Sequence, residues 1–129
     1  MVVQPPVVTH ETLVAGFREL GLAPGALVMI HSSLSAFGYV EGGAETVITA
    51  LLDAIAPNGT LVLPTLCQRD KERREETWDM AQSPSDVGKI TEVFRTWPSA
   101  MRSDHFTHSV AALGPLAAEI TSGHATAYG

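Results

Sequence analysis

The sequence predicts an α/β fold with a parallel or mixed sheet, and three observations carry this prediction. Short continuous apolar runs alternate with segments whose apolar residues recur every three or four positions, as in buried strands and amphipathic helices. Glycine and proline stand at most of the boundaries between them. The first two apolar runs are joined by a helical segment, and such a βαβ unit implies parallel pairing with a right-handed crossover.

In the first half of the chain, local signals place two helices and two strands. Thr9 precedes the first amphipathic segment as its expected N-cap, and Gly21 is placed to end it. The dipeptide Asn58-Gly59 is a strong turn signal after the second helix. The predicted elements are a helix at 11–20, a strand at 26–30, a helix at 44–55 and a strand at 60–63 that ends at Pro64-Thr65.

The second half begins with a long charged stretch, residues 67–87, in which the apolar residues show no regular helical or strand spacing. A loop this long in a compact domain is usually functional or mobile, and the alternative is a solvated charged excursion. Trp78 favours a functional loop, because a tryptophan among charges should pack against something. The further predicted elements are a helix at 86–96 capped by Ser85 and stopped by Pro98, a strand at 109–113 and a short helix at 116–120.

Composition narrows the class of protein. The 129 residues are 45% hydrophobic and 17% charged, which is typical of one globular domain rather than a disordered chain. The formal charge of −6 argues against a non-specific nucleic-acid binder, and no apolar run reaches the ~20 residues of a membrane span. With a single cysteine, Cys67, and an N-terminus unlike a signal peptide, we expect a reduced, cytoplasmic compartment and no disulfide framework.

The most informative stretch is residues 28–37, VMIHSSLSAF. An apolar run stops at His31-Ser32-Ser33, and a helical pattern opens after a later pair of glycines. A strand end with small hydroxyl residues and a glycine turn before a helix is a place where phosphates bind, through backbone N–H groups and the positive end of the helix. The alternative is a polar loop that only caps the helix.

Other chemistries find less support in the sequence. The spacing His105-x-x-His108, with His124, suits metal ligands, but Cys67 does not complete a zinc site and we expect no metal. The nucleophile elbow G-x-S-x-G is absent, as are the Walker A loop and G-x-G-x-x-G. The sequence therefore argues against Ser-triad hydrolysis and against nucleotide triphosphate hydrolysis.

Three segments together carry a resemblance to a known family. They are HSSLSAFGYVEGGAETVITALLDAIAPNGTLVLPT, SPSDVGKITEVFRTWPSAMRSDHFTHSVAALG and the ending SGHATAYG. In their order and separation they resemble the antibiotic 3-N-acetyltransferase family, from about Thr9 to Gly129. The resemblance implies a three-layer α/β/α fold and the transfer of an acetyl group from acetyl-CoA to the 3-amino group of an aminoglycoside, an antibiotic-resistance activity.

The resemblance also implies roles for individual positions. Those expected to contact CoA are His31, Ser32, Ser33, Pro64, Thr65, Ser109, Val110 and Ala111. The first three would meet its pyrophosphate and pantetheine arm, and the last three would run along the pantetheine. Asp70, Trp78 and Asp79 fall in the region that holds the aminoglycoside, and carboxylates with an aromatic face suit a polycationic sugar. Phe106 replaces the proline usual after the histidine of this motif, so the resemblance assigns no role to His105.

Members of the family are longer, and their catalytic histidine lies in a later Asn-Thr-x-x-His type motif that has no match here. We therefore expect residues 1–129 to be a single domain, the N-terminal part of such an enzyme and truncated relative to the family fold. Its catalytic base would lie in a missing C-terminal half, with His105 or His108 as a substitute in principle. The alternative function is a catalytically silent CoA-binding or oligomerisation module. A truncated sheet exposes an edge or an apolar face, so we expect self-association or a complementing C-terminal half.

Overall fold

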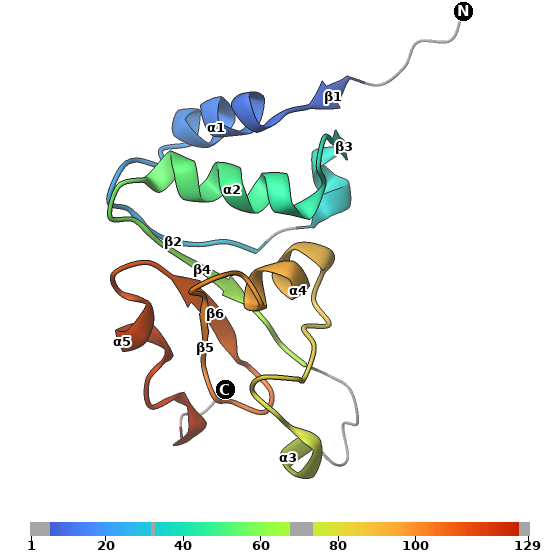
Figure 1. Cartoon of the computed structure of the whole chain (residues 1–129), viewed down its shortest axis with the longest axis vertical. Helices are drawn as coiled ribbons and strands as arrows, with labels where there is room; N and C mark the ends of the chain where they lie inside the picture. Colours follow the sequence, from blue (N-terminus) through green and yellow to red (C-terminus); the bar gives the residue numbers. More distant parts are fainter. Residues whose placement is uncertain (1–5, 32, 68–73, 127–129) are drawn as a thin grey trace, which may run out of the picture.

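A computed structural model describes residues 6–31, 33–67 and 74–126 of the chain (Figure 1). The strands are β1 Val7–Val8, β2 Leu27–Met29, β3 Tyr39–Val40, β4 Thr60–Pro64, β5 Met101–Arg102 and β6 Val110–Leu113. The helices are α1 His10–Glu19, α2 Ala44–Ile55, α3 Arg74–Thr77, α4 Lys89–Arg95 and α5 Ala117–Thr121, with 3₁₀ helices η1 Leu34–Phe37 and η2 His124–Thr126. Over the described residues, no helix combines the length and apolar character needed to cross a membrane.

Four of the strands form one mixed sheet in the order β2-β4-β6-β5. β2 runs parallel to β4, with Leu27 opposite Thr60 and Met29 opposite Val62, so the predicted βαβ unit is confirmed. β6 is antiparallel to both β4 and β5. The sheet is mixed because the chain turns back after β5 and inserts β6 between β4 and β5. The other two strands, β1 and β3, form a separate parallel pair.

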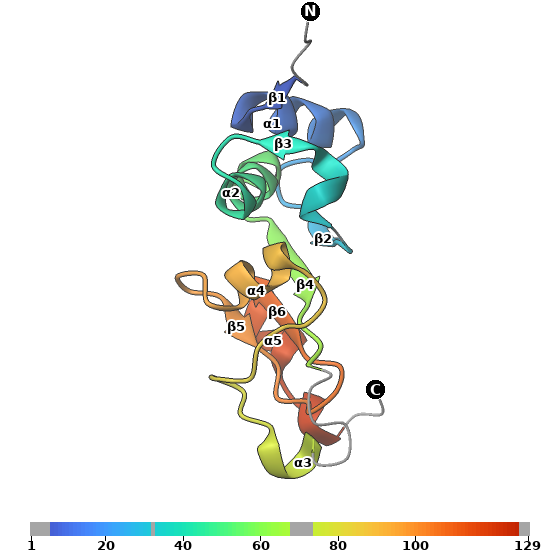
Figure 2. The ribbon, with the colours of Figure 1, turned by 90° about the vertical axis from the view of Figure 1, so that its right-hand side faces the viewer.

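Helices cover both faces of this sheet, which confirms the α/β prediction. Side chains alternate along β4: Leu61 and Leu63 are fully buried in the cluster formed with α2 and α4, whereas Val62 packs in a second cluster with α5. α4 and α5 accordingly lie on opposite sides of β4 and β6 (Figure 1). The view turned by 90° shows an elongated molecule, with α1 and α2 toward one end and α3 toward the other (Figure 2).

The two long helices form as the sequence predicts. α2 has the predicted bounds and buries Ile48, Leu51 and Ile55 almost completely. α1 begins one residue earlier than expected, and Thr9 is its N-cap, accepting the Thr12 N–H at 3.3 Å within a capping box. Both helices contribute their apolar faces to one core cluster, so packing against each other and against β4 stabilises them.

The expected helix at 86–96 is shorter than predicted, because α4 begins at Lys89. Its N-cap is Gly88, whose φ of 135° is a conformation that favours glycine, and no side chain caps the helix. Ser85 is not the cap. Its hydroxyl is instead 2.7 Å from that of Thr91 inside the helix. The hydroxyl of Ser85 thus makes a side-chain contact six residues farther along instead of the predicted capping bond.

The path from His31 to α2 also differs from a simple strand–loop–helix turn. η1 and β3 intervene, and α2 starts at Gly43 without a side-chain cap. β3 pairs with β1, which holds the start of the chain beside this connection. His31 and Ser33 therefore follow the end of β2, as predicted, but they do not lead directly into the helix N-terminus.

Candidate functional site

The carboxyl ends of β2 and β4 lie side by side because the two strands are parallel neighbours. The Ile30 N–H donates to the Val62 carbonyl at 3.0 Å. Beyond these ends is a cavity of about 200 Å³ lined by His31, Pro64, Leu66, Val87 and Thr91. Two of the positions expected to contact CoA thus share one hollow, at the sheet edge where open α/β sheets bind ligands.

The hydroxyl residues after His31 are described in part. Ser33 is exposed, and its hydroxyl lies 3.0 Å from that of Ser35 rather than on the backbone of η1. Ser32, the central residue of the predicted phosphate loop, lies outside the described residues. The pyrophosphate contact of this loop stays a prediction.

Thr65 and Ser109 form a fully buried polar pair where β4 ends and β6 begins. The Thr65 N–H donates to the Ser109 carbonyl at 2.8 Å, and the Ser109 hydroxyl lies 2.9 Å from the Thr65 carbonyl and 3.0 Å from the Thr65 hydroxyl. Val110 and Ala111 follow in β6, which is paired with β4 on one side and β5 on the other. At the start of β6, the Val110 N–H donates to the Ser103 hydroxyl at 2.9 Å and the Val110 carbonyl accepts the Ser103 N–H at 2.8 Å.

Arg102 joins that buried pair to the loop of residues 78–83. Its Nε donates to both hydroxyls, at 3.3 Å to Thr65 and 3.2 Å to Ser109, and its Nη2 donates to the Thr65 carbonyl at 2.8 Å. Its Nη1 donates to the carbonyls of Met80, at 3.2 Å, and Ser83. One planar group thus bridges the sheet end and the loop.

The guanidinium of Arg102 also packs on an aromatic ring. Its central carbon lies 4.7 Å from the centroid of the Trp78 ring, and the Trp78 indole N–H donates to Asp104 at 2.7 Å. Burial lowers the pKa of Arg102 to about 10, helped by the charge of Arg95, so the group stays protonated at neutral pH. The Trp78 ring is the aromatic face predicted to receive a substrate amine. One side of this ring is therefore already covered by the Arg102 guanidinium.

Asp79 shapes the loop while remaining at the surface. One carboxylate oxygen, Oδ1, accepts the N–H groups of Ala81 at 2.9 Å and Gln82 at 3.3 Å, and the Asp79 N–H donates to the Ser83 hydroxyl at 2.9 Å. This is the turn chemistry that aspartate favours. The other predicted substrate carboxylate, Asp70, lies outside the described residues.

An ion pair between Arg95 and Glu92 holds the far side of the same loop. Arg95 donates to Glu92 through Nε at 2.9 Å and Nη2 at 2.7 Å, and its Nη1 donates to the Ala81 carbonyl at 3.2 Å. Glu92 also accepts the Ser85 N–H at 2.5 Å. Burial raises the pKa of Glu92, but the hydrogen bonds and positive charges around it outweigh burial and leave the pKa below its ordinary value.

Three histidines gather beside the turn between β5 and β6. The ring centroids of His105 and His124 are 4.5 Å apart, and those of His105 and His108 are 5.8 Å apart. His105 Nδ1 accepts the His108 N–H at 2.9 Å, and His124 Nδ1 lies 2.6 Å from the Ser103 hydroxyl. Burial and the neighbouring histidines lower the pKa of His124. Across the three described ranges, no group of three His, Cys, Asp or Glu side chains is placed to hold a metal ion.

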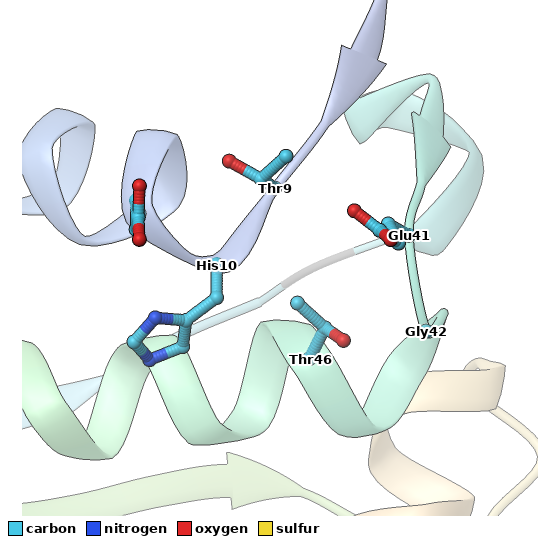
Figure 3. Close-up of a pocket in the computed structure, with 6 residues that line it drawn as sticks. Thr9, His10, Glu41, Gly42 and Thr46 are labelled. Carbon is cyan, nitrogen blue, oxygen red and sulfur yellow. The ribbon is translucent and has the colours of Figure 1, made fainter.

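A larger and more open hollow, of about 470 Å³, lies between the start of α1 and the start of α2 (Figure 3). Thr9, His10, Glu41, Gly42 and Thr46 surround it, with Glu11. The His10 ring is turned toward α2 (Figure 3), where its Nε2 lies 2.6 Å from the Asp53 carboxylate. Both partners are substantially exposed, so this pair contributes little to stability.

Sequence reasoning missed Arg102, the residue that connects the predicted positions to one another. Its strand has only two residues, and the sequence analysis placed no strand there. The strand register identifies it. Arg102 pairs with Ala111, which pairs with Leu63, so the three side chains lie on the same face of the sheet. A charged residue on a covered face needs polar partners, and the loop carbonyls supply them.

Comparison with known proteins adds a family model and close structural neighbours. The model described as aminoglycoside 3-N-acetyltransferase matches residues 29–129. The chain is 35% identical, over 134 aligned residues, to aminoglycoside N(3)-acetyltransferase IX of Micromonospora chalcea, an alignment that covers 91% of this chain and 48% of that relative. The chain thus spans about half the length of the curated relatives it matches.

Solved structures agree with the sequence comparison. AAC-IIIb in a binary complex with CoASH matches with a TM-score of 0.80 and 31% identity, over 92% of this chain and 50% of that one. AAC-VIa bound to sisomicin matches with a TM-score of 0.82 and 32% identity, again over 92% of this chain and 50% of that one. The fold of this chain is therefore similar to about half of each of those proteins.

Proposed function

The chain belongs to the aminoglycoside 3-N-acetyltransferase family, and from this premise we propose that it supplies the CoA-binding and aminoglycoside-contacting part of an enzyme that acetylates the 3-amino group of an aminoglycoside. The observation that carries the proposal is the cavity where β2 and β4 end. Pro64 lines that cavity, and the next residue, Thr65, is tied through Arg102 to loop 78–83, which contains Asp79. Donor and acceptor sites that adjoin in this way would bring an amine to a thioester.

For the donor, we propose that acetyl-CoA enters at the carboxyl ends of β2 and β4. His31 and Ser33 would lie at its pyrophosphate, with Ser32 between them. Pro64 and Thr65 would form a wall beside its pantetheine arm, with the end of β6 at Ser109–Ala111 beyond. The family membership and the CoASH complex of a structural neighbour support this placement.

For the acceptor, we propose that the aminoglycoside lies against loop 78–83 and Asp70. One oxygen of the exposed Asp79 carboxylate shapes the turn, which leaves its other oxygen to face a ligand amine. The formal charge of −6 would also attract a polycation from solution. The sisomicin complex of a structural neighbour supports an acceptor of this class.

For the catalytic base, we propose a histidine from the other half of the fold that the relatives possess. Within the described residues, His105 Nδ1 accepts the His108 N–H, so the neutral ring carries its proton on Nε2 and offers no lone pair to a substrate proton. For the isolated chain, this observation favours the second candidate function, which is a catalytically silent CoA-binding module. A positioned base typically contributes ~10²–10⁴-fold to rate, and we expect a deficit of that size.

The edge of the sheet indicates where a complementing half would pack. Among the strands of the described residues, β2 is the last on its side of the sheet, and Leu27 and Met29 are 56% and 53% exposed. Unpaired edges with apolar side chains favour the addition of further chain. We propose the complementing half as the partner here, and self-association is the competing outcome that sedimentation of the isolated chain would reveal.

Calorimetry with CoA tests the proposal. Ser33→Glu adds bulk and negative charge beside the proposed pyrophosphate, so we expect it to weaken CoA binding by about tenfold or more. Ser122→Glu, at the exposed end of α5, is the matched control and should bind CoA as the parent does. Unchanged binding by Ser33→Glu would falsify the placement. Release of CoA thiol by the 129-residue chain, at the rate of a full-length relative, would contradict the proposed origin of the base.

A further inference from the structure

We propose that Arg102 is a positioning residue that couples the donor and acceptor sites. It ties loop 78–83, on the acceptor side, to Thr65 and Ser109, on the donor side. The identity of the two ligands rests on the proposed function, whereas the mechanical connection rests on the contacts of Arg102 alone.

The donors of the guanidinium are divided between the two sides. Nε and Nη2 are directed at the hydroxyls and carbonyl of the Thr65–Ser109 pair, and Nη1 is directed at the carbonyls of Met80 and Ser83. Because the guanidinium is planar and rigid, a displacement of one set of acceptors is passed to the other set. A lysine ammonium on a flexible stem could satisfy one side only.

The loop depends on this attachment for its position. The hydrogen bonds of Asp79 lie within residues 79–83, so they shape the turn without fixing it to the sheet. Among the described residues, the loop is hydrogen-bonded to other elements through Arg102, through the Arg95 contact to Ala81 and through the Trp78 contact to Asp104. Of these, only Arg102 also reaches the ends of β4 and β6.

The charge of Arg102 adds a directional effect on the acceptor. A guanidinium already stacked on the Trp78 ring repels ligand ammonium groups from that face. Asp79, the carboxylate within loop 78–83, is then the favoured partner for a ligand amine, because the Asp104 carboxylate already accepts the Trp78 indole N–H. Arg102 would thus set both the position of the loop and the side from which a cation approaches.

The coupling is measured by titrating sisomicin into the full chain with and without saturating CoA. In the parent we expect CoA to change the sisomicin dissociation constant by about fivefold or more, and reciprocity requires the same factor for CoA. In Arg102→Met and Arg102→Lys we expect this factor to fall to near one. Arg18→Met, on the exposed last turn of α1, is the matched control and should keep the parental factor.

Amide hydrogen exchange of Ala81, Gln82 and Ser83 gives a readout that needs no aminoglycoside. We expect exchange to become about tenfold faster or more in Arg102→Met, with α2 unchanged, because charge-assisted hydrogen bonds to the loop are lost. Parental exchange together with a parental coupling factor would overturn the proposal. If the parent binds no sisomicin, the proposed function fails while exchange still decides the role of Arg102. If Arg102→Met does not fold, Arg102→Lys carries the same expectations.

Discussion

Two regions of the molecule are held together by different forces. The helical region, formed by α1, α2 and the β1–β3 pair, buries apolar side chains such as Ile48 and Leu51. The clamp region, formed by loop 78–85 and the ends of β4 to β6, is fixed by Arg102, Glu92 and Arg95 through hydrogen bonds to backbone carbonyls and amides. In the helical region the stabilisation is spread over many apolar contacts. In the clamp region it is concentrated in the hydrogen bonds of a few charged side chains.

The difference matters because the proposed acceptor contacts among the described residues, Trp78 and Asp79, lie in the clamp region. A polar clamp fixes a surface loop without covering it with apolar groups, so carboxylates remain accessible to a cationic ligand. The cost is local stability, since a segment with few buried apolar contacts opens more easily than a helix core. We therefore expect mutations in the helical region to lower the free energy of unfolding strongly, and mutations in the clamp region to lower it less and in a pH-dependent way.

The largest effect should come from the helical region. Leu51→Ala removes a fully buried side chain from α2, and we expect it to lower the free energy of unfolding by about 2–5 kcal/mol. Leu20→Ala is the matched control, because Leu20 is 80% exposed and the same change there should stay within about 0.5 kcal/mol. Urea unfolding measures both. Equal losses would mean that the packing of α1 on α2 does not stabilise this region.

A smaller and pH-dependent effect should come from the clamp region. We expect Glu92→Gln to cost about 1 kcal/mol at pH 7, a reduced figure because the carboxylate is about a third exposed. Since folding lowers the pKa of Glu92, its stabilisation is fully present above the ordinary pKa of 4.5 and is lost as pH falls through the lowered pKa.

Unfolding free energies of the parent and Glu92→Gln, measured at a series of pH values, check this expectation. The difference between them should be constant near neutral pH and should shrink in acid. Glu19→Gln, at the exposed end of α1, serves as the matched control. A difference that widens on acidification would show that the ion pair with Arg95 is not the source of the stabilisation.

The same contrast explains which parts of the fold could be predicted from the sequence. α2, β4 and the Thr9 cap follow from periodicity and capping, which act over a few neighbouring residues. β5 and the β1–β3 pair have two residues per strand, too few for any pattern, and they exist because partner strands far away in the chain hold them. The start of α4 was misplaced because Ser85 bonds inward to Thr91 instead of capping.

For the site, the sequence predicted which residues lie at strand ends, but it did not predict the side-chain contacts that connect them. The placement of His31 and Pro64 in one cavity follows from parallel pairing, which periodicity can predict. The resemblance supplied Trp78 and Asp79, but not that Arg102 covers one face of the ring or that Asp79 folds the turn. The first contact joins residues that are far apart in the chain, Trp78 and Arg102, and the second depends on the side-chain rotamer of Asp79, so no local pattern encodes either.

The central claim is that CoA binds where β2 and β4 end, beside the clamp region. Hydrogen–deuterium exchange of the full chain, with and without saturating CoA, tests it most directly. We predict slower exchange at residues 33–36, 65–66 and 80–83, with no change at residues 9–11 and 41–46, which line the larger hollow of the helical region. Protection confined to residues 9–11 and 41–46 would contradict the account.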